Sequence, residues 1–208
     1  MRRILAALIM LCVVAVPTAA HADTSEFTFD SFHADYTLGR DADGTSRLAV
    51  VETIVAHFPD FDQNRGIVRA IPNDYDGVPL NTVVESVTDA TGAPVPFEQN
   101  YTGDFVELAL GTDAFVRGVQ TYVISYSQTN VVRYFSDTDD DEFYWDVNGT
   151  GWDQPFGEVS MALHVDPAEL QQRPITGRAP QGPEWAGTGR ELFAAFRATV
   201  GTADTGAS

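Results

Sequence analysis

The sequence predicts an all-β fold, and within that class an antiparallel β-sandwich of about ten short strands. Three observations support this prediction. Apolar and polar residues alternate with a period of two over most of the chain. Clusters of Gly, Asp, Asn and Thr interrupt this alternation at short intervals. No amphipathic helical segment separates the expected strands, which fits a sandwich or a barrel, and we favour the sandwich.

The beginning of the chain, residues 1–22, predicts a signal peptide. Arg2 and Arg3 precede an apolar run, Ile4 to Val16, that is too short to cross a bilayer comfortably. Ala20-His21-Ala22 has the small-x-small pattern of a signal-peptidase site, so cleavage is expected before Asp23. The alternative is an uncleaved membrane anchor. With a cleaved signal, the mature chain is exported and works outside the cell or at its surface.

Two strands joined by a hairpin are expected first. One lies near Phe27–Leu38, and the turn residues Asp41–Gly44 connect it to a second strand that ends at Phe58. Leu48 and Ile54 share one face of this second strand. Turn signals separate nearly all of the remaining expected strands, which are Gly66–Ile71, Asn81–Thr88, Val95–Gln99, Phe105–Leu110, Val119–Ser127, Val131–Phe135, Phe143–Val147 and Val159–Val165.

The sequence changes character after Pro167. We expect the sandwich domain to span residues 23–171, and residues 172–208 to form a loosely ordered tail rich in Gly and Pro. No second apolar segment follows the signal, so no transmembrane helix is expected after it.

The composition narrows the classes of partner and chemistry. The chain has a formal net charge of −18 and no lysine, and losing Arg2 and Arg3 with the signal would bring this charge to −20. Such a surface repels nucleic acid and anionic lipid. The single cysteine, Cys12, lies in the signal, so a disulfide or a cysteine nucleophile is not expected in the mature chain. The expected partner is a protein or another component of the cell envelope.

Glu52 has an unusual position in the pattern. It is in phase with Leu48 and Ile54, so a regular strand would direct its carboxylate into the core. A buried carboxylate needs a partner, and Arg69 is the nearest arginine on another expected strand. We therefore predict a structural ion pair between Glu52 and Arg69. A ligand-binding or catalytic acid, or a bulge that turns Glu52 outward, are the alternatives.

A dense group of acidic residues follows Ser136. Asp137, Asp139 and Asp141 are candidate ligands for calcium, because this ion binds clustered oxygen atoms on loops. The EF-hand spacing is absent, since Glu142 stands where that motif needs glycine. A solvated acidic loop is the other interpretation. Calcium is the only cofactor that the sequence suggests.

The aromatic residues Tyr144, Trp145 and Trp152 allow two interpretations. Flat aromatic side chains beside carboxylates and amides could form a platform for a carbohydrate ligand. Alternatively they belong to the core, with Trp152 covering one end of the sandwich. The chain has no G-x-S-x-G motif, phosphate-binding glycine loop or metal-binding histidine pair, so we expect no catalytic residues and no enzymatic activity.

Four motifs in order resemble a known bacterial family. Their residues are Gly44 with Leu48, Val50 and Glu52; Gly66-Ile67-x-Arg69-x-Ile71-Pro72; Gly118-x-x-x-Tyr122-x-Ile124-x-Tyr126; and Glu142-x-Tyr144-Trp145-x-x-x-Gly149-x-Gly151-Trp152-x-x-Pro155. Together they are similar to the N-terminal, extracytoplasmic domain of the predicted membrane proteins that carry domain of unknown function 2207. The resemblance covers roughly residues 27 to 167.

Family members usually continue into transmembrane helices that anchor them in the membrane, and this chain departs from that pattern. A truncated or frameshifted gene product, or a secreted variant, would account for the difference. The resemblance implies no biochemical activity. The expected function is therefore a non-catalytic interaction or sensing module at the bacterial cell surface. The alternative is a carbohydrate-binding or carbohydrate-active envelope protein that uses Trp145, Trp152 and nearby carboxylates.

Overall fold

The computed structural model describes residues 26–135, 140–149, 151–165, 175–178 and 197–200, and every regular element among them is a β-strand. The all-β prediction is therefore confirmed. The strands are β1 (Thr28–Arg40), β2 (Ser46–Phe58), β3 (Gly66–Pro72), β4 (Asp74–Tyr75), β5 (Val78–Pro79), β6 (Val83–Thr88), β7 (Phe97–Thr102), β8 (Phe105–Gly111), β9 (Gly118–Thr129), β10 (Val132–Phe135), β11 (Asp140–Phe143), β12 (Phe156–Val165), β13 (Ile175–Arg178) and β14 (Arg197–Val200).

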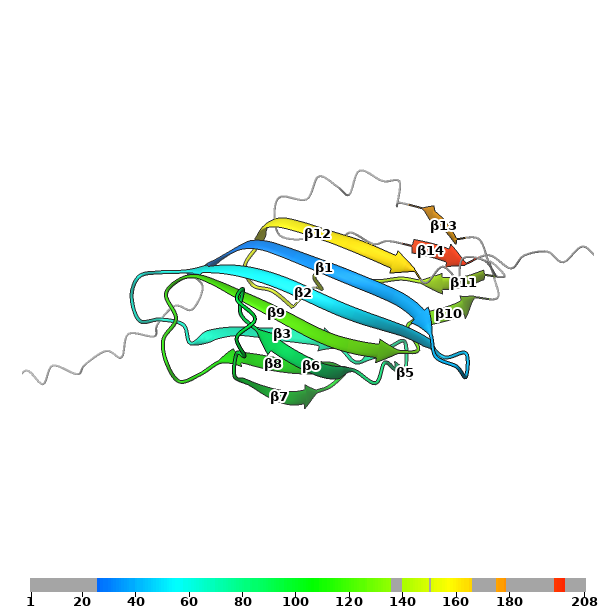
Figure 1. Ribbon diagram of the computed structural model, residues 1–208, viewed down its shortest axis with the longest axis horizontal. Helices are drawn as coiled ribbons and strands as arrows, with labels where there is room; N and C mark the ends of the chain where they lie inside the picture. Colours follow the sequence, from blue (N-terminus) through cyan, green and yellow to red (C-terminus); the bar gives the residue numbers. More distant parts are fainter. Residues whose placement is uncertain (1–25, 136–139, 150, 166–174, 179–196, 201–208) are drawn as a thin grey trace, which may run out of the picture.

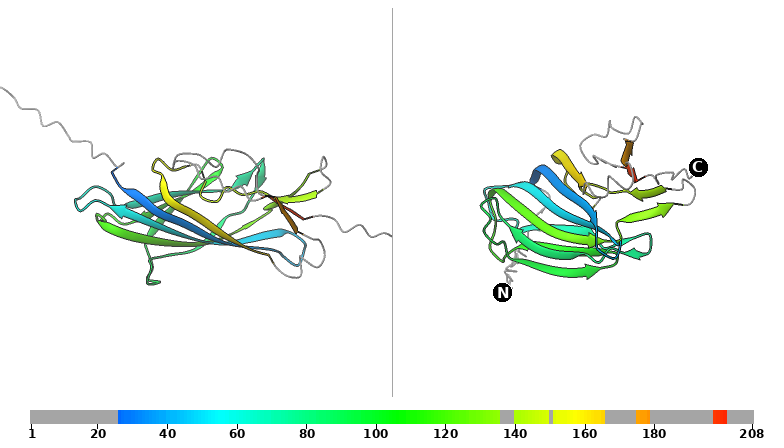
Figure 2. Two further views of the ribbon diagram at one scale, coloured as in Figure 1. Left: turned by 90° about the horizontal axis from the view of Figure 1, so that it is seen from above. Right: turned by 45° about the vertical axis from the view of Figure 1, so that its right-hand side comes forward.

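Two sheets form the sandwich. The larger has the strand order β12-β1-β2-β9-β6, and the smaller has the order β3-β8-β7 (Figure 1). A third sheet, β10-β11-β14-β13, lies at one end of the molecule, where β10 and β11 project in the right-hand view of Figure 2. The short β4-β5 pair completes the set.

The central strands form a long antiparallel ladder. β1 and β2 pair from Thr28 opposite His57 to Arg40 opposite Ser46, with one irregularity between Phe29 and Ser31. β2 then pairs along its whole length with β9. One pairing departs from the antiparallel pattern, because β12 runs parallel to β1 at the edge of the sheet.

Alternation along the strands builds the core between the two sheets. Phe32 and Tyr36 of β1, Ile54 of β2, and Ile71 and Leu108 of the facing sheet are all fully buried. Each belongs to a strand whose inward residues recur at every second position, as a pleated strand requires. The expected apolar face of β2 is thus the face that packs inside.

The structure differs from the expectation at the end of β11. A strand was expected over Phe143–Val147, but the ladder stops at Phe143, which is opposite Ala198 of β14. Burial nevertheless continues to alternate through Val147. The chain therefore keeps the side-chain pattern of a strand beyond the end of the β11 ladder.

Two segments of the range expected as a tail are strands, namely β13 and β14. They pair with each other, and β14 also pairs with β11. The rest of that range, and the whole of the expected signal peptide, lie outside the described residues. Within the described residues, no helix has the length and apolar character needed to span a membrane.

Candidate functional site

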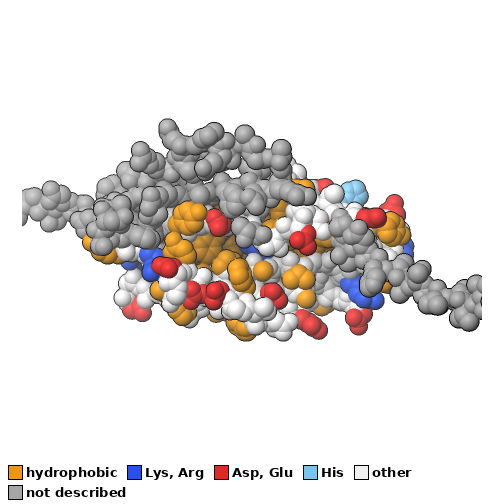
Figure 3. Space-filling view, turned by 180° about the vertical axis from the view of Figure 1, so that it is seen from behind, with side chains coloured by type: hydrophobic (Ala, Val, Ile, Leu, Met, Phe, Trp, Pro, Cys, Tyr) orange, Lys and Arg blue, Asp and Glu red, His pale blue; other side chains and the backbone are white. Residues whose placement is uncertain are grey.

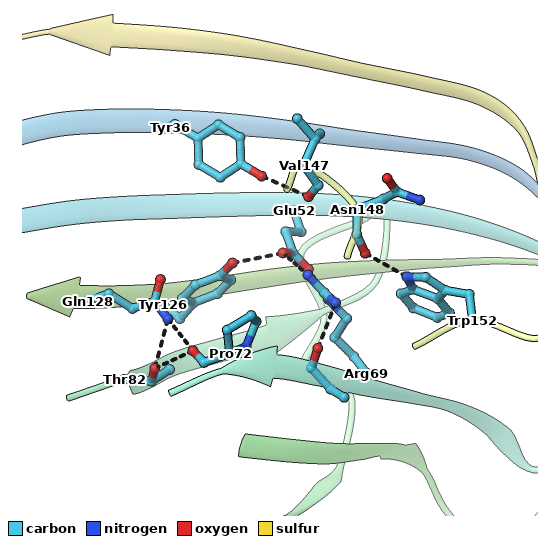
Figure 4. A network of polar contacts seen from close by, with 11 residues as sticks. Tyr36, Glu52, Arg69, Pro72, Thr82, Tyr126, Gln128, Val147, Asn148 and Trp152 are labelled. Atoms are coloured by element: carbon cyan, nitrogen blue, oxygen red, sulfur yellow. Dashed lines mark hydrogen bonds and ion pairs between the residues drawn. The ribbon is translucent and has the colours of Figure 1, made fainter. Parts of the chain in front are cut away.

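A bidentate ion pair joins the two sheets in the middle of the core. Arg69 of β3 donates from Nε to Glu52 Oε2 at 2.8 Å and from Nη2 to Glu52 Oε1 at 2.7 Å (Figure 4). Glu52, on β2, is fully buried, and only 3% of the Arg69 side chain is exposed. The structure thus brings together Glu52, which alternation places in the core, and Arg69, the arginine predicted as its partner. Paired N–H···O bonds of this kind suit the planar guanidinium group.

Neighbouring groups make further hydrogen bonds and ring contacts with Glu52 and Arg69. The Tyr126 hydroxyl of β9 donates to Glu52 Oε1 at 2.8 Å, and Arg69 Nη1 donates to the Ala70 carbonyl at 2.8 Å. The rings of Phe32 and Trp152 lie with their centres 5.7 Å and 5.5 Å from the Arg69 guanidinium carbon. These partners offset the cost of burying the charges, which is the condition for a stable buried ion pair.

The buried position also changes the acidity of these groups. Burial alone lowers the pKa of Arg69, but the charge and hydrogen bonds of Glu52 outweigh it, so the pKa of Arg69 is raised. Burial, with a further contribution from the Glu52 charge, raises the pKa of Tyr126 well above its usual value. The same two causes raise the pKa of Tyr36. Arg69 therefore stays charged, and Tyr126 keeps the proton that it donates to Glu52.

A neutral polar cluster lies beside the ion pair. Gln128 donates from Nε2 to the Pro72 carbonyl at 2.6 Å and to Thr82 Oγ1 at 2.8 Å. Thr82 Oγ1 in turn donates to the same Pro72 carbonyl at 3.2 Å (Figure 4). These bonds connect the end of β3 to β9 and to the residues before β6.

The aromatic residues of the stretch after β11 mostly pack in the core. Trp145 is 8% exposed and stacks on Phe143 at a centroid distance of 5.9 Å. Trp152 packs edge-on against Phe29 and Phe156, and its indole N–H donates to the Asn148 carbonyl at 2.6 Å. Tyr144 is 38% exposed. Tyr144, Trp145 and Trp152 therefore do not form one exposed aromatic platform.

A cavity of about 830 Å³ lies at the end of the sandwich where β3 begins and β8 ends. Its lining includes Phe27 and Phe29 at the start of β1, Trp152, and Phe97 of β7. Gln63, in the loop before β3, also lines it. Only one of the three residues predicted as an aromatic platform, Trp152, therefore borders this cavity.

The acidic calcium candidates are mostly beyond the described part of the chain. Asp137 and Asp139 lie outside it, and Asp141 belongs to β11, where the structure describes the backbone. Among the residues that are described, no group of three or more His, Cys, Asp or Glu side chains is arranged to hold a metal ion. Calcium binding at Asp137, Asp139 and Asp141 stays a prediction.

Sequence reasoning missed two polar residues. Tyr126, the third member of the ion-pair network, shares its strand face with Tyr122 and Ile124, so alternation already placed its side chain in the core. The missing information was the strand order that brings β9 beside β2. Gln63 lies in a loop, where no periodic signal reports burial.

Several solved structures match the chain at low sequence identity. They include an M1 zinc metallopeptidase E323A mutant from Deinococcus radiodurans (14% identity, TM-score 0.45, 84% of this chain and 38% of that chain). The native leukotriene A4 hydrolase from Saccharomyces cerevisiae matches at 8% identity with a TM-score of 0.45, over 88% of this chain and 29% of that chain. A putative protease from Parabacteroides distasonis matches at 12% identity with a TM-score of 0.40, over 86% of this chain and 36% of that chain. The chain spans well under half the length of each of these proteins. Among curated proteins, no sequence matches the chain.

The chain belongs to the family described as predicted membrane protein (DUF2207), N-terminal domain, whose model matches residues 28–202. This match confirms the resemblance that the sequence motifs suggested. It also extends beyond the sandwich to include β13 and β14.

Proposed function

We propose that this member of the DUF2207 family is a non-catalytic β-sandwich module that binds a protein or another component of the cell envelope outside the cytoplasm. The observation that carries the proposal is the closed Glu52–Arg69–Tyr126 network. These are the chemically most distinctive side chains among the described residues, and they bond to one another inside the core. They therefore act as structure, and the chain presents its surface to a partner.

The charge of the surface supports a macromolecular partner. Acidic side chains are spread over the face shown in Figure 3, and hydrophobic side chains gather in the middle of it. With 30 acidic residues against 12 arginines, the chain would attract basic partners and repel nucleic acid. Exported location follows from the predicted signal peptide.

A carbohydrate ligand is the second candidate. Trp152 lines the cavity at the end of the sandwich together with the carboxylates of Asp113 and Asp153. Aromatic and carboxylate side chains around one cavity are suited to a sugar ring and its hydroxyl groups. The opposing observation is that Phe29, Phe156 and Arg69 already pack around the indole of Trp152.

One experiment distinguishes these functions. The mature chain is incubated with isolated cell envelopes from the source organism, with untreated, protease-treated and periodate-oxidised samples in parallel. The proposal expects binding that protease treatment abolishes and periodate leaves intact. Loss on periodate treatment alone would identify the carbohydrate candidate, and release of soluble envelope fragments would reveal an enzyme. No binding to any sample would contradict both binding functions.

A further inference from the structure

The strand β7 forms a free edge of the smaller sheet. It pairs with β8 on one side, and no strand in the described part of the chain pairs with it on the other. All six of its residues are exposed, and the strand lies at the lower rim of the molecule in Figure 1. β7 therefore presents a row of backbone N–H and C=O groups that another strand can bind.

The edges formed by β3 and β6 are protected in ways that β7 is not. The stretch after β11 packs against β3, where a methyl group added to Gly151 would lie 3.8 Å from Cβ of Ala70. The pairing of β6 with β9 is irregular between Val84 and Ser86, and such an irregularity discourages further pairing. β7 pairs with β8 in an unbroken register and contains neither proline nor lysine. It is thus a regular strand that remains open to pairing.

The ladder with β8 decides which residues of β7 turn their backbone toward the free edge. Just before the strand, the Pro96 carbonyl accepts a hydrogen bond from the Gly111 N–H at 2.9 Å. Along an antiparallel ladder, residues that bond to the neighbouring strand alternate with residues whose N–H and C=O point away from it. Counted from Pro96, the residues that point away from β8 are Phe97, Gln99 and Tyr101.

We propose that β7 pairs antiparallel with β7 of a second copy of this chain, across a two-fold axis at Gln99. The segment Phe97–Tyr101 is nearly symmetric about Gln99, with a polar residue on each side and an aromatic residue beyond it. In this arrangement Gln99 faces itself and Phe97 faces Tyr101, so the outward backbone groups of all three residues are paired. The aromatic rings also lie opposite each other. This symmetry favours a second copy over a strand of another polypeptide.

The charge of β7 supports the same register. Glu98 is the only charged residue of the strand, and in this register it faces Asn100 of the second copy. An axis one residue earlier would place Glu98 opposite its own copy, and like charges in that position are unfavourable. The inference goes beyond the proposed function, because the dimer forms without an envelope partner.

Sedimentation velocity of the purified mature chain tests the proposal. We expect a reversible dimer whose population rises with protein concentration. Two copies of this acidic chain repel each other at long range, so the dimer should be about threefold tighter or more in ~0.5 M than in ~0.05 M sodium chloride. A chain that stays monomeric at every concentration and salt would overturn the proposal.

A charge placed on the axis locates the interface. Gln99→Glu would set two carboxylates directly opposite each other, and it should weaken the dimer about fivefold or more. The matched control is Ala42→Glu, which adds the same charge at an exposed position in the β1–β2 turn. Equal weakening by the two variants would mean that the dimer uses another surface, and it would overturn the proposal.

Single cysteines test the register, because the sequence has no cysteine after Cys12. In the proposed dimer the two Cα atoms of residue 99 lie about 5.5 Å apart, within disulfide range. Gln99→Cys should therefore give a covalent dimer on mild oxidation. Thr102→Cys, on the same strand, should not, because its two copies lie about 20 Å apart. Equal crosslinking of the two variants would rule out this register.

A proline variant distinguishes the other occupant of the edge. Gln99→Pro removes an N–H that points away from β8, so the monomer should keep its fold while the dimer is lost. If the parent chain is monomeric and Gln99→Pro abolishes binding to cell envelopes, a strand of another polypeptide occupies β7. That result would overturn pairing with a second copy and leave the proposed function standing.

Discussion

At the scale of single residues, the Glu52–Arg69 pair shows how a charge can be kept in a core. Each group makes two bonds to the other, and Tyr126 and the Ala70 carbonyl take up further donors and acceptors. Since the two sheets each contribute one partner, the pair also fixes how they sit on each other. A pair of apolar residues could pack the same space, and we expect it to specify this register less strictly.

We predict that Glu52→Gln or Arg69→Met alone lowers the free energy of unfolding by about 3 kcal/mol, because each leaves a buried charge without its partner. The double variant should cost less than the sum, with a coupling energy well above ~0.5 kcal/mol. Tyr126→Phe, which removes one hydrogen bond and no charge, should cost about 1–2 kcal/mol. Urea unfolding measures all four variants. Simple additivity of the two single effects would mean that the pair does not act as a unit.

The buried tyrosines predict loss of stability at alkaline pH. Burial raises the pKa of Tyr122 from 10.0 to about 12, and the pKa values of Tyr36 and Tyr126 are also raised. Because the pKa is higher in the folded state, the protonated tyrosine contributes fully to the free energy of unfolding below about pH 10. This contribution is lost as the pH rises toward 12. The free energy of unfolding should therefore fall across this window. Tyr122→Phe should make that fall shallower; an unchanged slope would count against a buried, protonated Tyr122.

At the scale of elements, the contact of β3 with β8 depends on two glycines, Gly66 and the Gly111 opposite it. We predict that Gly66→Ala lowers the free energy of unfolding by about 3 kcal/mol or more, because its methyl group would overlap the Leu110 carbonyl and its φ of +142° is unfavourable for other residues. The control is Gly103→Ala in the β7–β8 turn, which also has a positive φ but has no atom within 4 Å of the added methyl. That change should cost about 1 kcal/mol. Thermal unfolding of both variants gives the comparison, and equal losses would mean that φ alone matters.

Strands are predictable from this sequence where side-chain burial and backbone pairing coincide. Alternation located β1, β2, β3, β8 and β9 closely, and it placed Glu52 on an inward face. It failed after Phe143, because Trp145 and Val147 keep the alternating burial of a strand although the ladder has ended. A period of two reports which side chains are inside, but it does not report whether a neighbouring strand is present.

Partners far apart in the sequence are less predictable. The parallel pairing of β1 with β12 has no local signal, because residues at the two ends of the domain decide it together. The same holds for the cavity, where loop residues such as Gln63 meet strand residues such as Phe97. Pairing across the sandwich could be inferred for Glu52 only because a buried carboxylate demands a cation.

At the scale of the whole molecule, charge and location are linked. A chain with 30 acidic residues, 12 arginines and no lysine is well suited to stay soluble and apart from anionic surfaces. Cleavage of the predicted signal would remove two of those arginines from the chain. The acidic surface is then a property of the mature chain.

We predict that the mature chain begins at Asp23, because Ala20-His21-Ala22 precedes it with the pattern of a cleavage site. Intact-mass measurement of protein recovered from the culture medium or the cell-envelope fraction checks this. A product that retains Met1 would mean that the segment is an anchor or is not recognised.

The parallel edge of the large sheet has a mechanical consequence. β1 and β12 run side by side in the same direction, from Phe29 beside Phe156 to Leu38 beside Val165. A force that pulls the start of β1 away from the end of β12 would act along both strands in opposite senses, so their evenly spaced hydrogen bonds would share the load and shear together. Thr28 of β1 and His57 of β2 lie opposite each other at one end of their ladder. Pulling these two residues apart would instead break that ladder one bond at a time. A module held between a surface and a partner through the first pair of points would resist tension far better than through the second.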